Sequence, residues 1–273
     1  MRAAARIVAE AKAGATRLTV LRGESPLLLR RTGPPARVRP RTGADAGTRP
    51  PTGPDAEIHP PTGPDAGATV HLVGGAAGPL RGDDLLLEIE VGPGANLEIR
   101  SVAATLLLPG RPAPPSRLVV RATVAGTLRW RPEPTIAAAG CDHHAITEVD
   151  VAEGGTLLWR DDLVCGRHNE PSGAVRSDTT VRYAGRTLYR HRLTVGPGAP
   201  GWSGAAVLGD AGATGSVVMA GPDLPEPHRP AGGAAVMRLS GPGLLATAVG
   251  RDIRDVRAAL DPLCAARTPA MAA

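Results

Sequence analysis

The feature that most constrains the fold of this chain is a series of short apolar runs that recur about every ten residues. Glycine or proline ends most of these runs, which makes them typical of strands joined by turns. In the run at 84–91, apolar side chains alternate with Glu88 and Glu90, so one face of a strand is buried. The pattern predicts a mainly β protein, a sandwich or barrel with one large antiparallel-rich β domain of many short strands.

The expected strands share the alternation of a half-buried strand or a short continuous apolar core. They lie at 16–21, 26–30, 69–73, 84–91, 96–102, 117–124, 127–131, 145–151, 156–165, 179–184, 187–195, 215–220, 234–240 and 244–250. Glycine-containing turns at 91–96, 151–155 and 183–186 predict that the strands on either side of each turn pair as hairpins.

One short helix is expected near the C-terminus. Asp252 can cap its first turn, and the run 253–263 places apolar side chains at helical spacing. Pro262 lies inside this run, so we expect the helix to end near Leu260 or to kink there.

Residues 31–68 have a different composition from the rest of the chain. A Thr-Gly pair recurs every ten residues, and the segment is rich in Pro, Gly, Asp and Thr. Because it has almost no apolar side chains to bury, we expect a disordered, low-complexity insertion within a single domain of residues 1–273. A tethering or docking arm stays open as an interpretation, and a tolerated insertion in a surface loop is the one that we favour.

The composition argues against several classes of protein. The net charge is only +5 and aromatic residues make up 2%, which disfavours nucleic-acid binding. No apolar stretch is long enough to cross a membrane or to form a secretory leader. Three scattered cysteines do not form a disulfide framework, so we expect a reduced, cytoplasmic setting. Common nucleotide-binding and hydrolase motifs are absent, which favours a protein that binds partners over an enzyme.

The stretch GCDHH and the segment that follows it contain the candidate metal ligands. Thiol and imidazole groups suit a borderline-soft ion such as zinc or nickel. The candidates are Cys141, His143, His144, Cys165 and His168. If 141–151 and 156–166 form a hairpin, Cys141 and His143 share one face, while His144 lies on the other face together with Cys165. A complete four-ligand site is therefore not expected, and a transient contact with fewer ligands and an ordinary buried cysteine both stay open.

Five segments, in this order and spacing, carry a resemblance to a known family. They read TRLTVLRGESPLLLRRTGP, VGGAAGPLRGDDLLLEIEVGPGANLEIRSVAAT, TLRWRPEPTIAAAGCDHH, GGTLLWRDDLVCGRHNE and VGPGAPGWSGAAVLGDAGATGSVVM. Together they resemble the urease accessory protein UreD family, called UreH in some bacteria, and most of all its actinobacterial branch. The likeness covers nearly the whole chain apart from residues 34–68.

The resemblance implies a non-enzymatic urease maturation chaperone that is mostly β. It implies binding to the partner UreF and, through UreF, to the GTPase UreG, with docking on apo-urease and homodimerisation within the complex as further expectations. The expected task is nickel insertion into the urease active site, with nickel in transit and no tightly bound cofactor. The motif positions taken as scaffold or partner-binding residues are Gly82, Asp83, Pro132, Glu133, Pro134, Ile136, Gly166 and Arg167.

Two other readings of the residues stay open. The first is a metal-dependent enzyme that uses Cys141, His143 and Cys165, and the second is a structural β protein with a disordered arm. With so few aromatic residues, a binding protein of this composition is expected to use Trp130, Trp159 and Trp202, together with arginine and leucine, as interface anchors.

Overall fold

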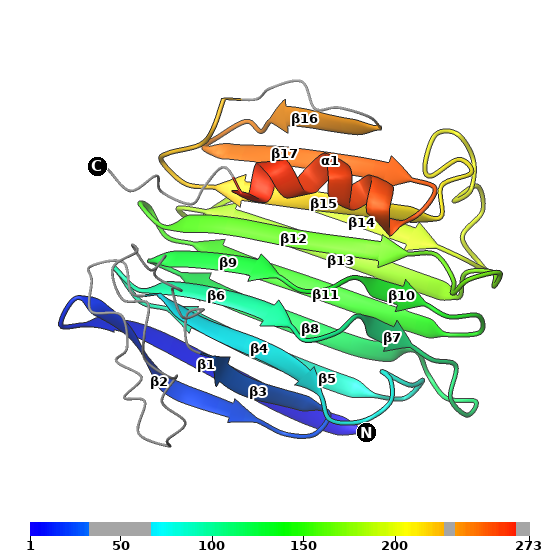
Figure 1. Ribbon diagram of the computed structural model, residues 1–273, viewed down its shortest axis with the longest axis horizontal. Helices are drawn as coiled ribbons and strands as arrows, with labels where there is room; N and C mark the ends of the chain where they lie inside the picture. Colours follow the sequence, from blue (N-terminus) through cyan, green and yellow to red (C-terminus); the bar gives the residue numbers. More distant parts are fainter. Residues whose placement is uncertain (33–66, 227–232, 266–273) are drawn as a thin grey trace, which may run out of the picture.

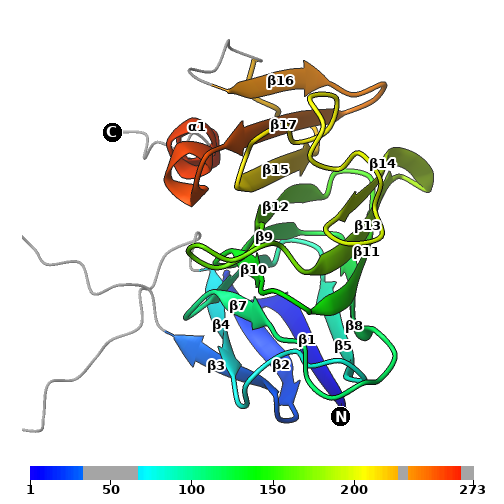
Figure 2. The ribbon, with the colours of Figure 1, turned by 90° about the vertical axis from the view of Figure 1, so that its right-hand side faces the viewer.

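Two β-sheets face each other in the computed structural model, which describes residues 1–32, 67–226 and 233–265 (Figure 1). The seven-stranded sheet, here sheet A, has the order β14–β13–β11–β8–β5–β1–β2. Sheet B has ten strands, and its main path is β16–β17–β15–β12–β9–β6–β4–β3, with β7 and β10 pairing beside it. Figure 2 shows the two sheets as separate layers, with the helix α1 (Ile253–Ala265) outside sheet B.

The strands have the following bounds. Sheet A contains β1 (Arg2–Lys12), β2 (Ala15–Gly23), β5 (Asp84–Val91), β8 (Ser116–Val124), β11 (Asp142–Val151), β13 (Ala174–Tyr183) and β14 (Arg186–Val195). Sheet B contains β3 (Leu27–Thr32), β4 (Ala68–Gly74), β6 (Asn96–Ser101), β7 (Thr105–Leu107), β9 (Thr127–Arg131), β10 (Thr135–Ala137), β12 (Thr156–Val164), β15 (Ala213–Ala220), β16 (Ala234–Arg238) and β17 (Gly243–Gly250).

The mainly β prediction is confirmed, but the expectation that most strands pair antiparallel is wrong. From β4 to β13 the chain passes back and forth between the two sheets. Each time it returns to a sheet, the new strand pairs in parallel with the strand that the chain formed there on its previous pass, as in β4–β6–β9–β12 and β5–β8–β11–β13. The strands β6, β9 and β12 begin at residues 96, 127 and 156, so one circuit takes about 30 residues. Antiparallel pairs lie toward the ends of the sheets, as in β1–β2, β13–β14 and β15–β17.

Two of the three predicted hairpins are therefore wrong. The turns at 91–96 and 151–155 carry the chain across the core into the opposite sheet, and only the turn at 183–186 joins paired neighbours, β13 and β14. The crossing turns stack on one another through backbone hydrogen bonds. The Ala125 N–H donates to the Val91 carbonyl at 2.8 Å, and the Ala152 N–H donates to the Val124 carbonyl at 2.8 Å. Each turn thus bonds to the turn of the next circuit.

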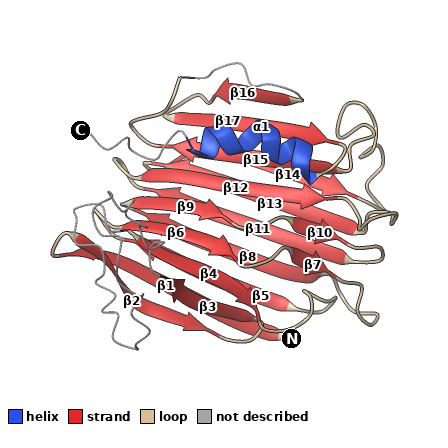
Figure 3. Ribbon diagram, in the orientation of Figure 1, coloured by secondary structure: helices blue, strands red, loops and turns tan. Residues whose placement is uncertain are grey.

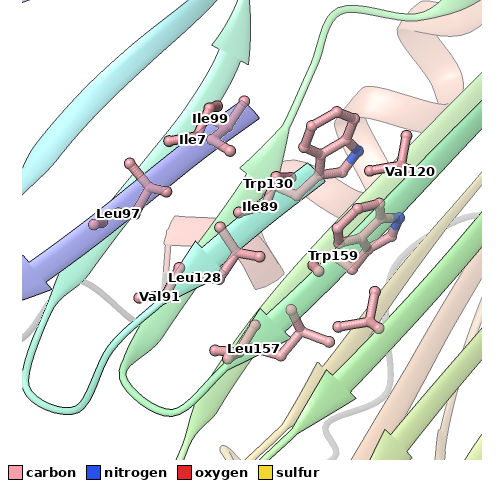
Figure 4. Close-up of a cluster of buried hydrophobic side chains, with 14 of the residues drawn as sticks. Ile7, Ile89, Val91, Leu97, Ile99, Val120, Leu128, Trp130, Leu157 and Trp159 are labelled. Atoms are coloured by element: carbon pink, nitrogen blue, oxygen red, sulfur yellow. The ribbon is translucent and has the colours of Figure 1, made fainter. Parts of the chain in front are cut away.

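The main core lies between the sheets (Figure 4). Sheet A contributes side chains such as Ile7, Ile89 and Val91, and these face Leu97 and other apolar residues of sheet B. Alternation along each strand produces this arrangement, because every second side chain points to the same side of the sheet.

Two tryptophans form the largest aromatic contact of this core. Trp130 on β9 and Trp159 on β12 stack with ring centroids 4.6 Å apart and ring planes 8° apart (Figure 4). Trp130 is 5% exposed and Trp159 is 1% exposed. The expectation that these two side chains anchor an interface is therefore wrong.

The N-terminal strand β1 was not among the expected strands. Its sequence, RAAARIVAEAK, is rich in alanine, which favours helices. In the structure Ala3, Ala5, Ile7 and Ala9 are buried, and the strand pairs parallel with β5 and antiparallel with β2. Burial between two strands outweighs the helix propensity of alanine here.

The predicted C-terminal helix is confirmed as α1 (Ile253–Ala265), shown in blue in Figure 3. Asp252 accepts a hydrogen bond from the Arg254 N–H at 2.7 Å, which caps the first turn. The helix continues through Pro262 to Ala265, so the expectation that it ends near Leu260 is wrong, and a kink at this point stays a prediction. Within the ranges described, no helix has both the length and the apolar character that a membrane crossing requires.

A second apolar cluster joins α1 to the outer face of sheet B, where Val256, Leu260 and Leu263 pack against β12, β15 and β17. The predicted disordered insertion lies almost entirely outside the described residues. Only its margins are described, and there Arg31 and Thr32 belong to β3 and Ala68 begins β4.

Candidate functional site

Cys141 and Cys165 contact the same small apolar cluster at one end of the sandwich, together with Leu107, Val175 and Val195. Burial raises the pKa of each thiol to about 11. Both cysteines are free thiols. The hairpin geometry placed Cys165 on the face of His144, and this expectation is wrong because β11 and β12 belong to different sheets. At neutral pH these thiols are protonated, which disfavours their use as nucleophiles or metal ligands.

His143 points into the protein from β11, where it is 4% exposed. Its Nδ1 lies 2.8 Å from the hydroxyl of Ser116 on the neighbouring strand β8. The same hydroxyl also lies within hydrogen-bond distance of the Asp142 carbonyl, at 3.2 Å. Burial, with a smaller contribution from the His144 charge, lowers the pKa of His143 to about 4. The side chain is a neutral, hydrogen-bonded core residue at physiological pH.

His143 is expected to make the folded state less stable in acid. The unfolded side chain has a pKa of 6.5 and the folded one a pKa of about 4, so the unfolded state binds more protons between these values. Stability should therefore fall by about 3 kcal/mol as the pH drops from 7 to 4. Urea unfolding gives the free energy of unfolding of the wild type and of His143→Asn at both pH values. The wild-type value relative to the variant's should be lower at pH 4 than at pH 7 by this amount.

The control for this prediction is His168→Asn, because His168 is exposed. Carboxyl groups such as Asp161, whose pKa burial raises to about 6, titrate in all three proteins. Their contributions to the pH dependence of stability therefore cancel when the proteins are compared. A difference between wild type and His143→Asn that is the same at pH 7 and pH 4 would contradict the prediction.

His144 lies on the opposite face of β11, as strand alternation predicted. Its Nε2 is 2.7 Å from Asp178 on β13. Arg176 and Arg192 also contact this carboxylate, at 2.8 and 2.5 Å. Hydrogen bonds from these side chains outweigh the effect of burial and lower the pKa of Asp178. His144 thus belongs to a surface hydrogen-bond network centred on Asp178, and His168 is an exposed residue of the loop after β12.

The structure therefore distributes the five candidate ligands over an apolar cluster, a buried hydrogen bond, an outer sheet face and a loop. In the described part of the chain, no group of three or more His, Cys, Asp or Glu side chains is placed to hold a metal ion. The transient nickel contact inferred from the sequence stays a prediction.

The GD turn precedes β5. Gly82 has a φ of 84°, and its N–H donates to the Pro114 carbonyl at 2.8 Å. Asp83 is 7% exposed and accepts from the Leu80 N–H at 2.8 Å. Its own carbonyl accepts from the Arg117 N–H at 2.7 Å, where β8 begins. These contacts give both residues a local role in fixing the turn that leads into sheet A.

The Pro-Glu-Pro segment connects β9 to β10 and contacts two other parts of the chain. The Glu133 N–H donates to the Ser101 hydroxyl at 2.8 Å, and its carboxylate pairs with Arg257 of α1. Pro134 is buried, and its carbonyl accepts from the Thr105 N–H at 2.9 Å. Ile136 lies on β10, between β7 and β12. The link from Glu133 to the C-terminal helix is a contact that no sequence pattern indicated.

Gly166 and Arg167 begin the loop between β12 and β13. Gly166 has a φ of 95°, and a Cβ at this position would lie 2.2 Å from the Glu170 carbonyl oxygen, so only glycine fits. Arg167 binds Glu170 through two bonds of 2.7 Å, and this pairing lowers the pKa of Glu170 to about 2. The loop is therefore fixed by its own side chains.

Sequence reasoning missed a buried ion pair beneath α1. Arg160 on β12 is 5% exposed, and its Nε donates to Asp162 at 2.9 Å. The same guanidinium pairs with Asp261 of the helix. No pattern in the run 160–162 indicated that Arg160 and Asp162 point toward a helix.

A family model described as UreD urease accessory protein matches residues 1–273. A urease accessory protein UreD from Parafrankia sp. (strain EAN1pec) is 38% identical over 298 aligned residues, covering 100% of this chain and 91% of that protein. A urease accessory protein UreD 3 from Streptomyces griseus is 41% identical and covers 96% of this chain and 95% of that protein.

The chain belongs to the UreD family of urease accessory proteins. As a UreD protein it has an accessory role in urease maturation, which agrees with the resemblance noted from the sequence alone. The residues of this UreD chain that were inferred from the family motifs lie in segments that connect strands, except Ile136, which lies in the short strand β10. The family name implies an accessory role and not a catalytic one.

Proposed function

We propose that this UreD chain is a non-enzymatic scaffold in urease maturation, which binds apo-urease together with UreF and, through UreF, UreG. In this proposal nickel is the cargo of the assembly and reaches the urease active site while the scaffold holds the partners together. The observation that carries the proposal is the family match over the whole chain. The fold is consistent with it, because a long two-sheet sandwich offers broad outer faces for partners.

The proposal leaves this chain without a resident cofactor. Burial raises the pKa of Cys141 and Cys165, and His143 is engaged with Ser116. A metal-dependent enzyme built on these three residues would require stoichiometric metal in the purified chain and loss of activity in Cys141→Ala and His143→Ala.

Deletion of the gene in its own host tests the proposal. We expect the urease subunits to accumulate normally but to contain little nickel, because the assembly that delivers the metal cannot form. Metal analysis and activity of the purified urease are the two measurements. Re-expression of the wild-type chain should restore both values, which controls for effects on neighbouring genes.

Nickel-loaded, active urease in the deletion strain would contradict the proposed function. The Cys141→Ala and His143→Ala variants, expressed in the same strain, separate the scaffold from the metal-dependent enzyme. A scaffold that folds with these substitutions still supports nickel loading of urease.

A further inference from the structure

Three rows of side chains cross the outer face of sheet A, and the middle row is apolar. Leu86 on β5 is the register partner of Val119 on β8, and Val119 is the partner of Ile146 on β11. Ala4 on β1 extends the row beyond Leu86. These side chains point away from the core between the sheets, because the alternate positions of the same strands fill that core. Two shallow grooves follow the row, one of about 310 Å³ lined by Ala4, Leu86 and Val119, and one of about 430 Å³ lined by Ile146.

Rows of mostly charged side chains flank the apolar row on both sides. Each flanking row takes one residue from β1, β5, β8 and β11, in that order. The side chains of Arg117, Arg121 and Glu148 are 49%, 55% and 43% exposed, so these rows face solvent. The rows consist of Arg2, Asp84, Arg117 and His144 on one side, and of Arg6, Glu88, Arg121 and Glu148 on the other. An apolar centre with a polar rim is typical of a protein interface.

The signs of these charges complement those of a second copy of the same face. Two copies can be related by a two-fold axis that runs parallel to the strands, midway between β5 and β8. Each β5 then faces the β8 of the other copy, and each β1 faces the other β11. Opposite charges meet at three pairs of positions, which are Asp84 with Arg117, Glu88 with Arg121, and Arg6 with Glu148.

The same axis also matches the apolar row with itself. Leu86 of each copy faces Val119 of the other, and Ala4 faces Ile146. Because the axis is parallel to the strands, the two sheets pack with their strands aligned, which is a common arrangement of stacked sheets. Leu86 and Ile146 are half-buried in the single chain and Ala4 is exposed, so contact between the copies removes further apolar surface from water.

Two more arginines of these rows meet no arginine of the other copy. Arg22 on β2 extends one charged row, and it faces Thr180 on β13. Arg2 faces His144, whose ring already contacts the Asp178 carboxylate at 2.7 Å. Neither position therefore places like charges of two arginines against each other.

Other two-fold axes through this face bring unfavourable groups together. An axis parallel to the rows would place Arg117 opposite Arg121. An axis between β1 and β5 would place Arg22 opposite Arg121, and one between β8 and β11 would place Leu86 opposite Asp178. Like charges that face each other across an interface cost several kcal/mol, and a carboxylate against an apolar side chain is also unfavourable. The axis between β5 and β8 avoids all three contacts.

We propose that the outer face of sheet A binds a second copy of this chain in a face-to-face dimer with two-fold symmetry. The apolar row supplies the affinity, and the flanking charges fix the axis. Arg121 already contacts Glu148 of its own chain at 3.0 Å, so an added ion pair between the copies contributes little by itself. The dimer is independent of the proposed function. Figure 2 shows α1 on the side of sheet B away from sheet A, so the dimer leaves the helix accessible on each copy.

The dimer should be weak because the contact is small. The three rows extend about 24 Å across six strands and about 20 Å along them, including the width of the outer side chains. A contact of this size covers about 500 Å² on each copy, which is below the roughly 800 Å² per partner of a standard interface. We therefore expect a reversible dimer with a dissociation constant on the order of 10–100 µM.

Two single charge reversals test the axis. Arg121→Glu makes two glutamates face each other across the axis, and Glu88→Arg makes two arginines face each other. Each variant alone should therefore associate at least about tenfold more weakly than the wild type. An equal mixture of the two variants should form a heterodimer, because every glutamate at these positions then faces an arginine of the other chain.

Sedimentation velocity of the full-length chain, at up to about 200 µM protein and about 0.1 M salt, measures the association, because charges within about 10 Å still interact at this salt concentration. The controls are Arg100→Glu and Glu98→Arg, which reverse an exposed ion pair on the outer face of sheet B. Neither control nor their mixture should change the dissociation constant by more than about twofold. Far-ultraviolet circular dichroism checks that each variant is folded. If a reversal disturbs folding, Arg121→Gln and Glu88→Gln replace it, and each should weaken association by a smaller factor.

A wild-type chain that stays monomeric at about 200 µM would overturn the inference. Single variants that associate as tightly as the wild type would overturn it as well. So would two folded variants that lose association alone and do not regain it when they are mixed. If the wild type forms no dimer and Arg121→Glu instead loses binding to UreF or to apo-urease, the face belongs to that partner, and the second copy is excluded as its occupant.

Discussion

Replacing Trp159 by alanine should lower the free energy of unfolding by about 3–5 kcal/mol, the range for removing a large aromatic side chain from a core. The side chain is 1% exposed and stacks on Trp130, so its loss leaves a cavity on one side of that ring. It also removes the hydrogen bond of 2.7 Å from the Trp159 indole to Asp161. Asp161 is a carboxyl group whose pKa burial raises to about 6, and it would lose a donor in the same step.

Urea unfolding followed by far-ultraviolet circular dichroism measures this effect without relying on tryptophan fluorescence. Val102→Ala is the control, because this side chain is 59% exposed and its truncation should change stability by less than about 0.5 kcal/mol. Trp159→Phe should fall between the two, since a smaller ring still contacts Trp130. A loss below about 1 kcal/mol in Trp159→Ala would show that Trp159 does not support the core.

Replacing Asp162 by alanine should cost about 3–5 kcal/mol, because it removes one partner of a buried ion pair. The side chains of Arg160 and Asp162 are only 7% and 2% exposed. After the change, the Arg160 guanidinium would keep Asp261, whose side chain is 57% exposed, as its carboxylate partner. Because Asp261 belongs to α1, the helix should also become less firmly attached to sheet B.

The double variant Arg160→Met, Asp162→Leu is the matched comparison. Replacing both charges with apolar side chains leaves no unpaired ion in the buried site, and the Asp261 carboxylate that loses Arg160 is 57% exposed to solvent. The loss of stability should therefore be smaller than that of Asp162→Ala alone. Hydrogen exchange of the amides in 253–265 reports on the helix directly and should accelerate most in the single variant. A double variant that is as unstable as the single one would contradict this account of the ion pair.

The prediction of strands from the sequence succeeded where a strand has a polar face and a buried face. The run at 84–91 shows this, since Leu85, Leu87, Ile89 and Val91 are buried and Glu90 is exposed. The helix α1 could be predicted because Asp252 supplies its cap and its apolar residues recur at helical spacing. The strand β1 was not predicted, because its buried side chains are mostly alanines. Alternating alanines do not distinguish a strand from a helix.

The candidate ligands show the limit of the same reasoning. Alternation correctly separated His143 from His144, because it depends only on the backbone of one strand. The position of Cys165 relative to Cys141 was predicted incorrectly, because it depends on which strands are neighbours. Trp130 and Trp159 illustrate the same limit, since only their stacking between the sheets explains why they are core residues.

The sequence by itself determined the β character of this protein, the positions of most strands, the capped helix and the UreD family. Those properties depend on residues that are close together in the chain or on the order of motifs along it. Only the tertiary structure decided the parallel pairing and the ion pair beneath α1. The physical reason is that glycine-rich turns look alike whether the chain folds back or crosses to the other sheet. Neighbouring strands of one sheet are then about 30 residues apart, as with β6 and β9, which begin at residues 96 and 127.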